Sequence, residues 1–296
     1  MKQHDIDISE VAGTGKGGRV LKEDMLRHLS QQDSMSPAPV PNDTTASEAD
    51  KTVRLSPTDS QMFKVMTKAL SIPHFGYTHN VDFTSLTRFR RKINARPENS
   101  PGHDKSFMTR LSALPFILKA LSQIFIKYPK LNAHLNPGSD GDARQLTIKH
   151  SHDFGIAVDT SNGLLVPVVK GVQNHSISSL DTEIKRLSAL AKEGKLTPSD
   201  MKGATFTVSN IGSIGGAAVS PVIVPPMVGI LGIGKAEPVP MFIHCEQGES
   251  QIARRERVVF SWSADHRVLD GASVARCAES LAKSLESIDE LCLSLK

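Results

Sequence analysis

The residues most able to do chemistry lie near the C-terminus, where His266 is followed four positions later by Asp270 and then by Gly271. A strand-like run ends before His266 and a helical pattern begins after Gly271, so the imidazole is expected at a strand-to-helix turn that can line a cleft. Near pH 7, a neutral imidazole in such a place is a suitable general base. Asp270 taken alone is equally well explained as a helix N-cap, which is a structural role.

A second candidate stretch, residues 205–216, joins a predicted strand to a glycine-rich turn that carries Ser209 and Ser213. Glycines let the backbone approach a ligand closely, and the two serine hydroxyls can donate to an anion. An ordinary glycine-rich turn explains the same residues. The stretch has no Gly-x-Ser-x-Gly nucleophile elbow, which disfavours a serine hydrolase.

The remaining motifs are weaker. A Gly-x-Gly-x-x-Gly string starts at Gly13, but its polar flank and the single following helix do not fit a dinucleotide-binding βαβ unit. A phosphate-binding P-loop would need Lys and Ser or Thr where Arg19 and Val20 stand. The string instead predicts a tight turn that displays Lys16, Arg19 and Lys22. This turn would be a basic docking surface or merely a solvated loop.

The histidines and cysteines do not predict a metal site. His150 and His152 would share a strand face, and His244 adjoins Cys245, but none has a further ligand at a zinc-like spacing. Three cysteines cannot build a disulfide framework, which indicates a reducing compartment.

Composition excludes several classes of function. The 296 residues carry a net charge of only +4, with one Trp and two Tyr, which argues against nucleic-acid binding. Aromatic residues make up 5%, so aliphatic side chains are expected to fill the core. The longest apolar run, residues 222–234, contains Pro225 and Pro226 and is too short to span a membrane, which predicts a soluble protein. The polar, acidic start resembles neither a signal peptide nor a transit peptide.

The chain divides into three parts by composition. Residues 1–30 form a small module, residues 31–52 are rich in Pro, Ser, Thr and Asp and read as a flexible linker, and residues 53–296 read as mixed α/β. Helices are expected over 61–71, 83–94, 111–128, 179–193 and 272–287. Strands are expected over 154–159, 164–169, 205–209 and 258–263. Ser178 and Asp181 suggest a capping box for the fourth helix, and Gly194 suggests its end.

Taken together, these stretches resemble the dihydrolipoamide acyltransferases of 2-oxo acid dehydrogenase complexes, whose wider class carries a His-x-x-x-Asp-Gly signature. The resemblance covers residues 53–296 and implies an α/β fold like that of chloramphenicol acetyltransferase, a mixed sheet covered by helices. Three motifs look most like the branched-chain member: IPHFGY at 72–77, SNIGSIGG at 209–216 and SWSADHR at 261–267. The resemblance therefore implies transfer of a branched-chain acyl group between dihydrolipoamide and coenzyme A.

The family's catalytic roles can be carried over to matching residues. His266 would be the general base, Ser209 would donate to the oxyanion, and Asp270 would hold the turn through an ion pair. Ser209 would face His266 of a neighbouring chain in a trimer that builds a larger core of 24 subunits. Extra residues around Pro97 to Arg110 make the position of Ser112 depend on the alignment. The implied coenzyme A contacts are Arg90, Ser112, Asp159, Ser209, Asn210, Ser213 and Gly234.

Residues 1–30 resemble the peripheral subunit-binding domain of the same family, which is a small helical domain. In this sequence the domain is truncated at its front. The resemblance implies docking of the branched-chain 2-oxo acid decarboxylase and dihydrolipoamide dehydrogenase in the mitochondrial matrix. The family's lipoyl domain and transit peptide have no counterpart in the sequence, so lipoate would be carried on a lipoyl domain outside this chain. Two alternatives stay open, namely an acetyltransferase of the pyruvate complex and a non-catalytic core or docking subunit.

Overall fold

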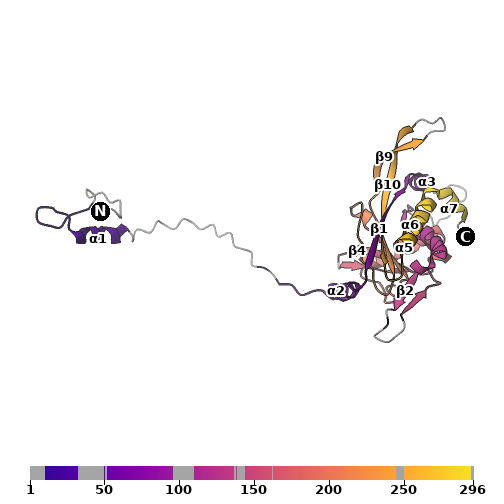
Figure 1. The fold of residues 1–296 in the computed structure, drawn as a ribbon, viewed down its shortest axis with the longest axis horizontal. Coiled ribbons are helices and arrows are strands. Elements are labelled where there is room, and N and C mark those ends of the chain that lie inside the picture. Colours follow the sequence, from indigo (N-terminus) through magenta and orange to yellow (C-terminus); the bar gives the residue numbers. More distant parts are fainter. Residues whose placement is uncertain are drawn as a thin grey trace. The chain divides into compact units, whose positions relative to one another are not determined.

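A computed structural model describes residues 11–32, 50, 52–95, 110–136, 138, 144–161, 163–244 and 250–294. The chain divides into two compact units, Met1–Arg54 and Leu55–Lys296 (Figure 1). Most of the predicted linker lies outside the described residues, as do Cys245 and the side chain of His244. No helix in the described ranges is long and apolar enough to cross a membrane.

The helices and strands are bounded as follows. The helices are α1 (Lys22–Gln32), α2 (Pro57–Ala69), α3 (Thr84–Asn94), α4 (Leu114–Lys127), α5 (Ile177–Lys192), α6 (Gly271–Glu286) and α7 (Ile288–Ser294), with short 3-10 turns η3 (Pro129–Leu131), η4 (Val172–Asn174) and η5 (Ile211–Ser213). The strands are β1 (His74–Asp82), β2 (Ala133–Asn136), β3 (Gln145–Ile148), β4 (Phe154–Thr160), β5 (Gly163–Leu165), β6 (Val168–Val169), β7 (Phe206–Asn210), β8 (Gly229–Ile233), β9 (Glu237–His244) and β10 (Ser250–Asp265).

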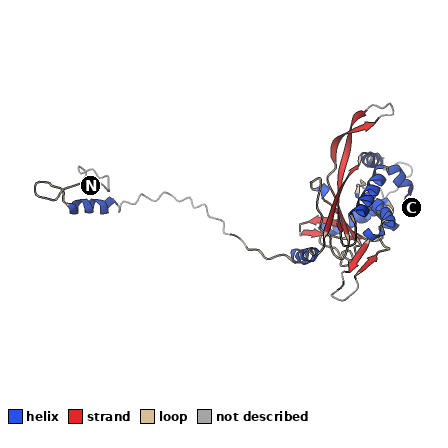
Figure 2. Ribbon diagram, viewed as in Figure 1, coloured by secondary structure: helices blue, strands red, loops and turns tan. Residues whose placement is uncertain are grey.

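The larger unit is built on an eight-stranded sheet (Figure 2). Its strand order is β1-β10-β8-β7-β4-β5, with β6 beside β4 and β9 beside β10. The β4–β7 and β7–β8 pairs are parallel, and the other pairs are antiparallel. The sheet is therefore mixed, and with helices α4, α5 and α6 packed on one face (Figure 1) it confirms the predicted α/β class.

Two neighbouring rows of side chains explain why the sheet has two different faces. One row across five strands belongs to the apolar core or packs against it and consists of Ile156, Val208, Leu231, Trp262 and Tyr77. The next row points the other way, because side chains alternate along a strand. Its members are small or polar: Ala157, Ser209, Gly232, Ser261 and Thr78. There the segment after the glycine-rich turn lies on the sheet, and Val219 N donates to Ser261 Oγ at 3.1 Å.

Aliphatic side chains make up most of the core, as expected, and a group of aromatic rings packs within it. The Phe125 ring lies 4.9 Å from the Phe206 ring and 5.7 Å from the Phe154 ring. Trp262 is 2% exposed and packs 6.1 Å from Phe206. Aromatic residues are few in this chain, but the sheet and α4 concentrate them between the layers.

Several element boundaries differ from the sequence expectations. The N-cap of α5 is Ser176, whose hydroxyl accepts from Ser179 N at 3.1 Å, so the capping box expected at Ser178 and Asp181 is wrong. Gly194 does end that helix region, with a φ of +67° that suits glycine. The strand expected over residues 164–169 is split into β5 and β6, and Pro167, which has no N–H, lies in the break.

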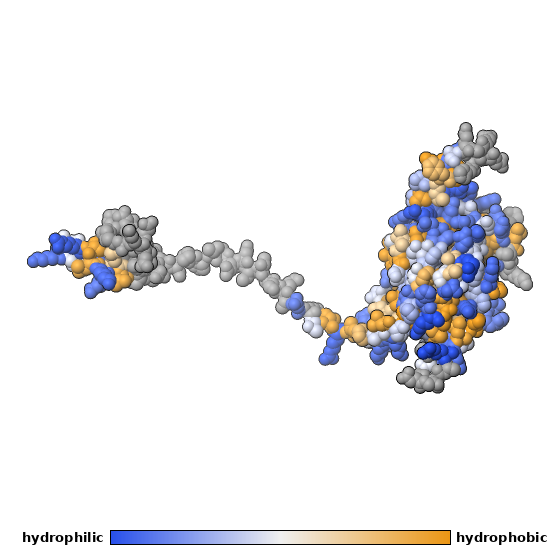
Figure 3. Space-filling view, viewed as in Figure 1, coloured by the Kyte–Doolittle hydropathy of each residue, from blue (hydrophilic) through white to orange (hydrophobic). Residues whose placement is uncertain are grey.

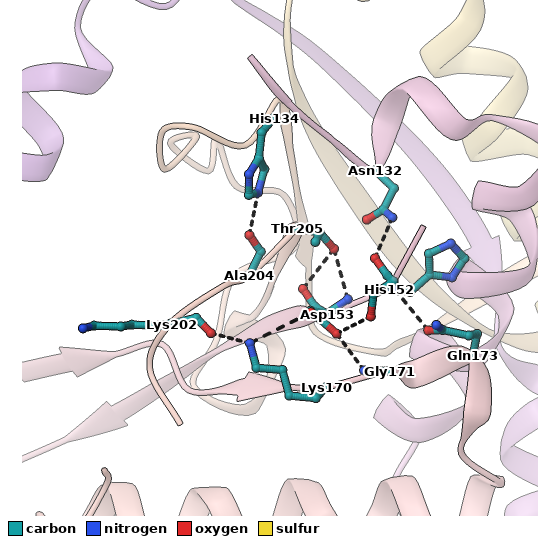
Figure 4. A network of polar contacts seen from close by, with 11 residues as sticks. Asn132, His134, His152, Asp153, Lys170, Gly171, Gln173, Lys202, Ala204 and Thr205 are labelled. Carbon is teal, nitrogen blue, oxygen red and sulfur yellow. Dashed lines mark hydrogen bonds and ion pairs between the residues drawn. The ribbon is translucent and has the colours of Figure 1, made fainter. Parts of the chain in front are cut away.

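A polar network fixes the parallel pair β4 and β7 near the starts of both strands (Figure 4). Thr205 N donates to Asp153 O at 2.7 Å, and Asp153 N donates to Thr205 Oγ1 at 3.0 Å. The Asp153 carboxylate accepts from Gly171 N at 2.7 Å and from Ser151 Oγ at 2.7 Å. These contacts join three chain segments, so they hold the register that places Ser209 on β7.

In the part of the smaller unit that the structure describes, the carboxylate of Asp24 ties α1 to the turn before it. Asp24 on α1 is 5% exposed and accepts from Thr14 N at 2.9 Å, Thr14 Oγ1 at 2.8 Å and Leu21 N at 3.0 Å. These hydrogen bonds hold the pKa of Asp24 below its ordinary value, with the Thr14 backbone contributing most. The glycine string forms the predicted tight turn, in which Gly17 and Gly18 both have φ of +79°.

Exposed apolar side chains gather on the projecting hairpin of β9 and β10 (Figure 3). Phe242 and Ile252 face each other across its two strands and are 73% and 70% exposed. Helix α2 also carries exposed apolar side chains, with Phe63 at 65%. Large apolar side chains left open to water in this way are typical of surfaces that contact another protein.

Candidate active site

His266 lies at the turn between β10 and α6, as predicted. Its Nδ1 lies 3.0 Å from Leu269 O, and its backbone N donates to Pro73 O at 2.9 Å. Because a carbonyl can only accept, Nδ1 must carry the proton, and the lone pair of the neutral ring is then on Nε2. The side chain is exposed, so Nε2 is available to a proton donor.

Asp265 organises this turn from inside the protein. Its side chain is fully buried, and it accepts from Arg267 N at 3.1 Å, Arg267 Nε at 2.8 Å and Arg267 Nη2 at 2.6 Å. Its backbone carbonyl accepts from Val268 N and Leu269 N at 3.1 and 3.0 Å. The bidentate ion pair between Asp265 and Arg267 is a strong, directional contact that fixes the loop carrying His266. The sequence analysis did not single out Asp265.

Phe75 explains why glycine follows the acidic residue of the signature. The Phe75 ring lies 5.1 Å from the His266 ring. A Cβ on Gly271 would lie 2.8 Å from the far edge of the same phenyl ring. Phe75 therefore lies against both ends of the turn, and a side chain at position 271 would require its ring to move. Phe75 was not singled out from the sequence, although it belongs to a motif that carries the resemblance.

Asp270 is the N-cap of α6. Its carboxylate accepts from Ser273 N at 2.7 Å and from Ser273 Oγ at 3.0 Å. These bonds lower the pKa of Asp270, and the backbone N–H of Ser273 contributes most. Within the described part of this chain the carboxylate bonds to Ser273 and forms no ion pair, which differs from the contact that the resemblance implied. The geometry is that of a capping residue.

The glycine-rich turn is shaped by close backbone contacts. A Cβ on Gly212 would lie 2.2 Å from Gly234 O, and a Cβ on Gly234 would lie 1.7 Å from Ala217 O. Neither residue can therefore carry a side chain without moving the backbone. The hydroxyl of Ser213 donates to Asn210 O at 3.1 Å, whereas Ser209 forms no side-chain hydrogen bond to any described residue.

A cavity of about 510 Å³ lies beside this turn. It is lined by five residues that the resemblance assigns to coenzyme A, namely Arg90, Ser112, Asn210, Ser213 and Gly234. They come from α3, from the segment before α4, from the glycine-rich turn and from the end of β8. A cation with hydroxyl and amide donors fits an anionic, phosphate-bearing ligand.

The guanidinium of Arg90 is already partly engaged. Its Nε and Nη2 donate to Leu111 O at 3.2 and 3.1 Å. Burial lowers the pKa of Arg90, but an arginine stays charged near neutral pH. The neighbouring Arg91 differs, because its Nη2 pairs with Glu256 Oε1 at 3.1 Å. Arg90 is thus the cation at the cavity wall that is not paired with a carboxylate within hydrogen-bonding distance in the described chain.

The other predicted site residues lie elsewhere. Asp159 is exposed on β4 and pairs with Leu164 of β5, outside the cavity. Ser209 precedes Asn210 on β7 but does not line the cavity. His266 and Asp270 do not line it either. Among the described residues no cluster of three or more His, Cys, Asp or Glu side chains could hold a metal ion.

The sheet separates Ser209 from His266 within one chain. Strand β7 is parallel to β8, whereas β10 is antiparallel to β8, so β7 and β10 end at opposite ends of the sheet. Ser209 pairs with Gly232, which pairs with Ser261, and His266 follows five residues later. At about 3.3 Å per residue, this is about 16 Å along the sheet. Ser209 and His266 of the same chain therefore cannot contact one reacting carbon.

Comparison with known protein families agrees with this architecture. Residues 47–293 match the family model of 2-oxoacid dehydrogenases acyltransferase (catalytic domain), and residues 1–26 match that of the e3 binding domain. A solved structure of a dihydrolipoamide acetyltransferase from Azotobacter vinelandii superposes with a TM-score of 0.73 and 31% identity, covering 87% of this chain and 100% of that one. That enzyme was studied for the catalytic roles of one serine, one histidine and one asparagine.

Curated relatives extend the similarity along the sequence. The bovine lipoamide acyltransferase component of the mitochondrial branched-chain alpha-keto acid dehydrogenase complex is 39% identical over 99% of this chain. The acetyltransferase component of the pyruvate dehydrogenase complex of Corynebacterium glutamicum is 32% identical over 97% of this chain. The chain spans 62% of the bovine relative and 42% of the bacterial one. From its sheet, its His266 turn and these matches, the chain belongs to the 2-oxoacid dehydrogenase acyltransferase family.

Proposed function

We propose that this protein transfers an acyl group between dihydrolipoamide and coenzyme A, with His266 as the general base. The observation that carries the proposal is the hydrogen bond between His266 Nδ1 and Leu269 O, which directs the free lone pair of Nε2 to solvent. A base presented in this way can accept the proton of a thiol that approaches Nε2. A family relative from Azotobacter vinelandii was studied for a catalytic histidine that is followed four residues later by an asparagine.

The reaction can be written with the chain's own residues in each role. His266 Nε2 accepts the thiol proton of coenzyme A, and the thiolate attacks the carbonyl carbon of the acyl thioester on dihydrolipoamide. The carbonyl oxygen becomes an oxyanion, to which the Ser209 hydroxyl donates. When the carbon–sulfur bond to dihydrolipoamide breaks, the leaving sulfur takes the proton from His266. No acyl-enzyme forms, and the reverse reaction follows the same steps.

The cavity beside the glycine-rich turn is the proposed coenzyme A site. Arg90 supplies a cation, and Ser112, Asn210 and Ser213 supply polar groups that suit the phosphates and amides of the ligand. Asp159 and Ser209 lie outside this cavity, so its lining does not support their proposed contacts with coenzyme A.

The complete site is proposed to form between two copies of the chain. His266 of one copy meets Ser209 of the next, because the two residues lie at opposite ends of the sheet within one copy. A trimer supplies three such sites, and trimers would build a larger core of 24 subunits. The exposed apolar hairpin and α2 offer surface for these contacts. A relative that is 31% identical forms the cubic core of a pyruvate dehydrogenase complex.

A mixing experiment tests the shared site. The His266→Ala and Ser209→Ala variants are each expected to be strongly impaired. When they are unfolded together and reassembled as mixed trimers, some sites regain both wild-type residues, so part of the activity should return. Mixed trimers that stay as inactive as the two variants would contradict the shared site.

The acyl group is proposed to be branched. Curated branched-chain relatives are 34–39% identical to this chain, and the pyruvate-complex relatives are 32–34% identical. Transfer to free dihydrolipoamide should be compared for isobutyryl-, acetyl- and succinyl-coenzyme A. A preference for acetyl over isobutyryl would replace the branched-chain assignment by the second candidate, the acetyltransferase. No transfer with any donor would favour a non-catalytic core subunit.

Each of the two units is proposed to have its own binding partners. The small unit is proposed to dock dihydrolipoamide dehydrogenase and the branched-chain 2-oxo acid decarboxylase through its basic turn. Lipoate would reach the site on a lipoyl domain, and the mitochondrial matrix is the proposed location, because several relatives are mitochondrial. Pull-down of each purified partner by the intact chain, and by an Arg19→Glu variant, tests the docking.

A further inference from the structure

The segment Arg110–Ser112, whose last residue lines the cavity, belongs to neither a helix nor a strand. A backbone of this kind needs partners for its polar groups when it is buried. Side chains from two helices supply them. Lys185 Nζ of α5 donates to Arg110 O at 3.0 Å, and Ser112 N donates to Asp181 Oδ1 of α5 at 3.4 Å.

Leu111, the middle residue, is held from the other side by α3. Leu111 N donates to Asn94 Oδ1 at 2.9 Å, and Asn94 Nδ2 donates to Leu111 O at 3.2 Å. The side chain of Leu111 is 3% exposed, so this backbone is well inside the protein. An amide side chain offers a donor and an acceptor together, and it pairs with a peptide as a neighbouring strand would. The Asn94 side chain thus satisfies both backbone polar groups of Leu111, which have no strand partner.

This bracing explains why α4 begins at Leu114 and not at residue 111, where the sequence analysis placed its start. Residues 110–112 are bonded to side chains of other helices, and the helical hydrogen bonds of α4 begin at the carbonyl of Ala113. Ser112, the residue after the braced peptide, consequently stands at the cavity wall. The clamp on Leu111 therefore sets where the Ser112 hydroxyl lies.

We propose that Asn94 is a positioning residue for coenzyme A, which acts through Leu111 to hold Ser112 at the cavity wall. The proposal rests on the proposed acyltransferase function. Asn94 also lines the cavity, but both polar atoms of its side chain are engaged by Leu111, so we infer that its effect on the ligand passes through the backbone. Asn94 takes no part in proton transfer, because His266 does not line this cavity.

The test compares Asn94→Ala with Lys92→Ala, a control on the exposed side of the same helix. In the intact chain, Asn94→Ala should raise the KM for coenzyme A and its dissociation constant by about tenfold, as expected for one lost positioned hydrogen bond. kcat and the KM for the acyl-dihydrolipoamide should change less than about twofold. A purely structural role would instead change kcat and both KM values together. Asn94→Asp keeps the acceptor for Leu111 N, and it serves as the second variant if the alanine variant does not fold.

A double variant decides whether Asn94 acts through Ser112. If it does, Asn94→Ala combined with Ser112→Ala should bind coenzyme A no more weakly than Ser112→Ala alone. Multiplied losses in the double variant, or wild-type affinity in Asn94→Ala, would overturn the positioning role. Wild-type protein that neither binds coenzyme A nor transfers an acyl group would overturn the proposed function itself.

Discussion

The turn that carries His266 and the turn that follows Ser209 are held in place by opposite means. Hydrogen bonds that converge on the buried Asp265 carboxylate hold the first turn. The second is held by close backbone contacts at Gly212 and Gly234, where no Cβ fits. A turn built from polar contacts can be altered chemically while its shape is kept. At a glycine where no Cβ fits, any substitution adds atoms that clash with the backbone. We therefore expect variants of the second turn to lower stability before they lower catalytic activity.

The largest expected effect is on catalysis at the polar turn. His266→Ala should lower kcat by about 10²–10⁴-fold, because the general base is lost. Stability should hardly change, since the side chain is exposed and makes one hydrogen bond. The control is His150→Ala, an exposed histidine away from the site. Steady-state kinetics and thermal unfolding separate the two effects, and a variant with full activity would rule out the mechanism.

The next effect should appear as instability at the glycine turn. A Cβ on Gly234 would lie 1.7 Å from Ala217 O, so Gly234→Ala should cost about 3 kcal/mol of unfolding free energy by overpacking. Gly215→Ala is the matched control, because its Cβ would meet nothing within 4 Å. Both are compared by denaturant unfolding at one protein concentration. Equal stability of the two variants would remove the distinction between the turns.

A variant of Asp265 tests whether the polar turn is held as described. Asp265→Asn keeps the shape of the side chain but places an amide donor against the Arg267 guanidinium. The free energy of unfolding should therefore fall by about 1–2 kcal/mol. The displaced turn should lower kcat by about tenfold, because small misplacements of a catalytic group are costly. Asp289→Asn, at an exposed residue of α7, is the control. Unchanged kcat would mean that Arg267 does not position His266.

The smallest effect concerns the cap that follows His266. Asp270→Ala should lower the Tm by a few degrees, and Asp270→Asn by less, because asparagine also caps helices. The pKa of Asp270 is lowered in the folded state, so its charge stabilises the protein above the unfolded pKa. The wild-type advantage over Asp270→Asn should therefore disappear as the pH falls through the folded pKa. An advantage that persists in acid would contradict a charged cap.

Local signals in the sequence predicted the helices better than the strands. The start of α6 follows from Asp270 as a cap, which needs only neighbouring residues. Strand β1 and the first half of β10 were not predicted, because their pairing joins His74 to Asp265 and depends on residues far apart in the sequence. Pro167 could have warned that the strand expected over residues 164–169 is interrupted.

The same limit applies to the site. A motif pointed to His266, and the resemblance to the family supplied five of the residues that line the cavity. The resemblance implied that Ser209 and His266 come from different chains, but their placement at opposite ends of the sheet cannot be worked out from the residues alone, because it depends on strand direction. Asn94 and Asp265 were missed because the role of a half-buried amide or of a buried carboxylate is recognisable only from its partners.

The position of β10 also has a consequence for biosynthesis. This strand lies between β1 and β8, so the sheet cannot close until residues 250–265 have been synthesised. A nascent chain that has made only β1 to β8 presents unpaired strand edges, and such edges invite association with other chains. Folding of the large unit is therefore expected to wait for nearly the whole chain to leave the ribosome, and a chain cut before β10 should depend on chaperones to stay in solution.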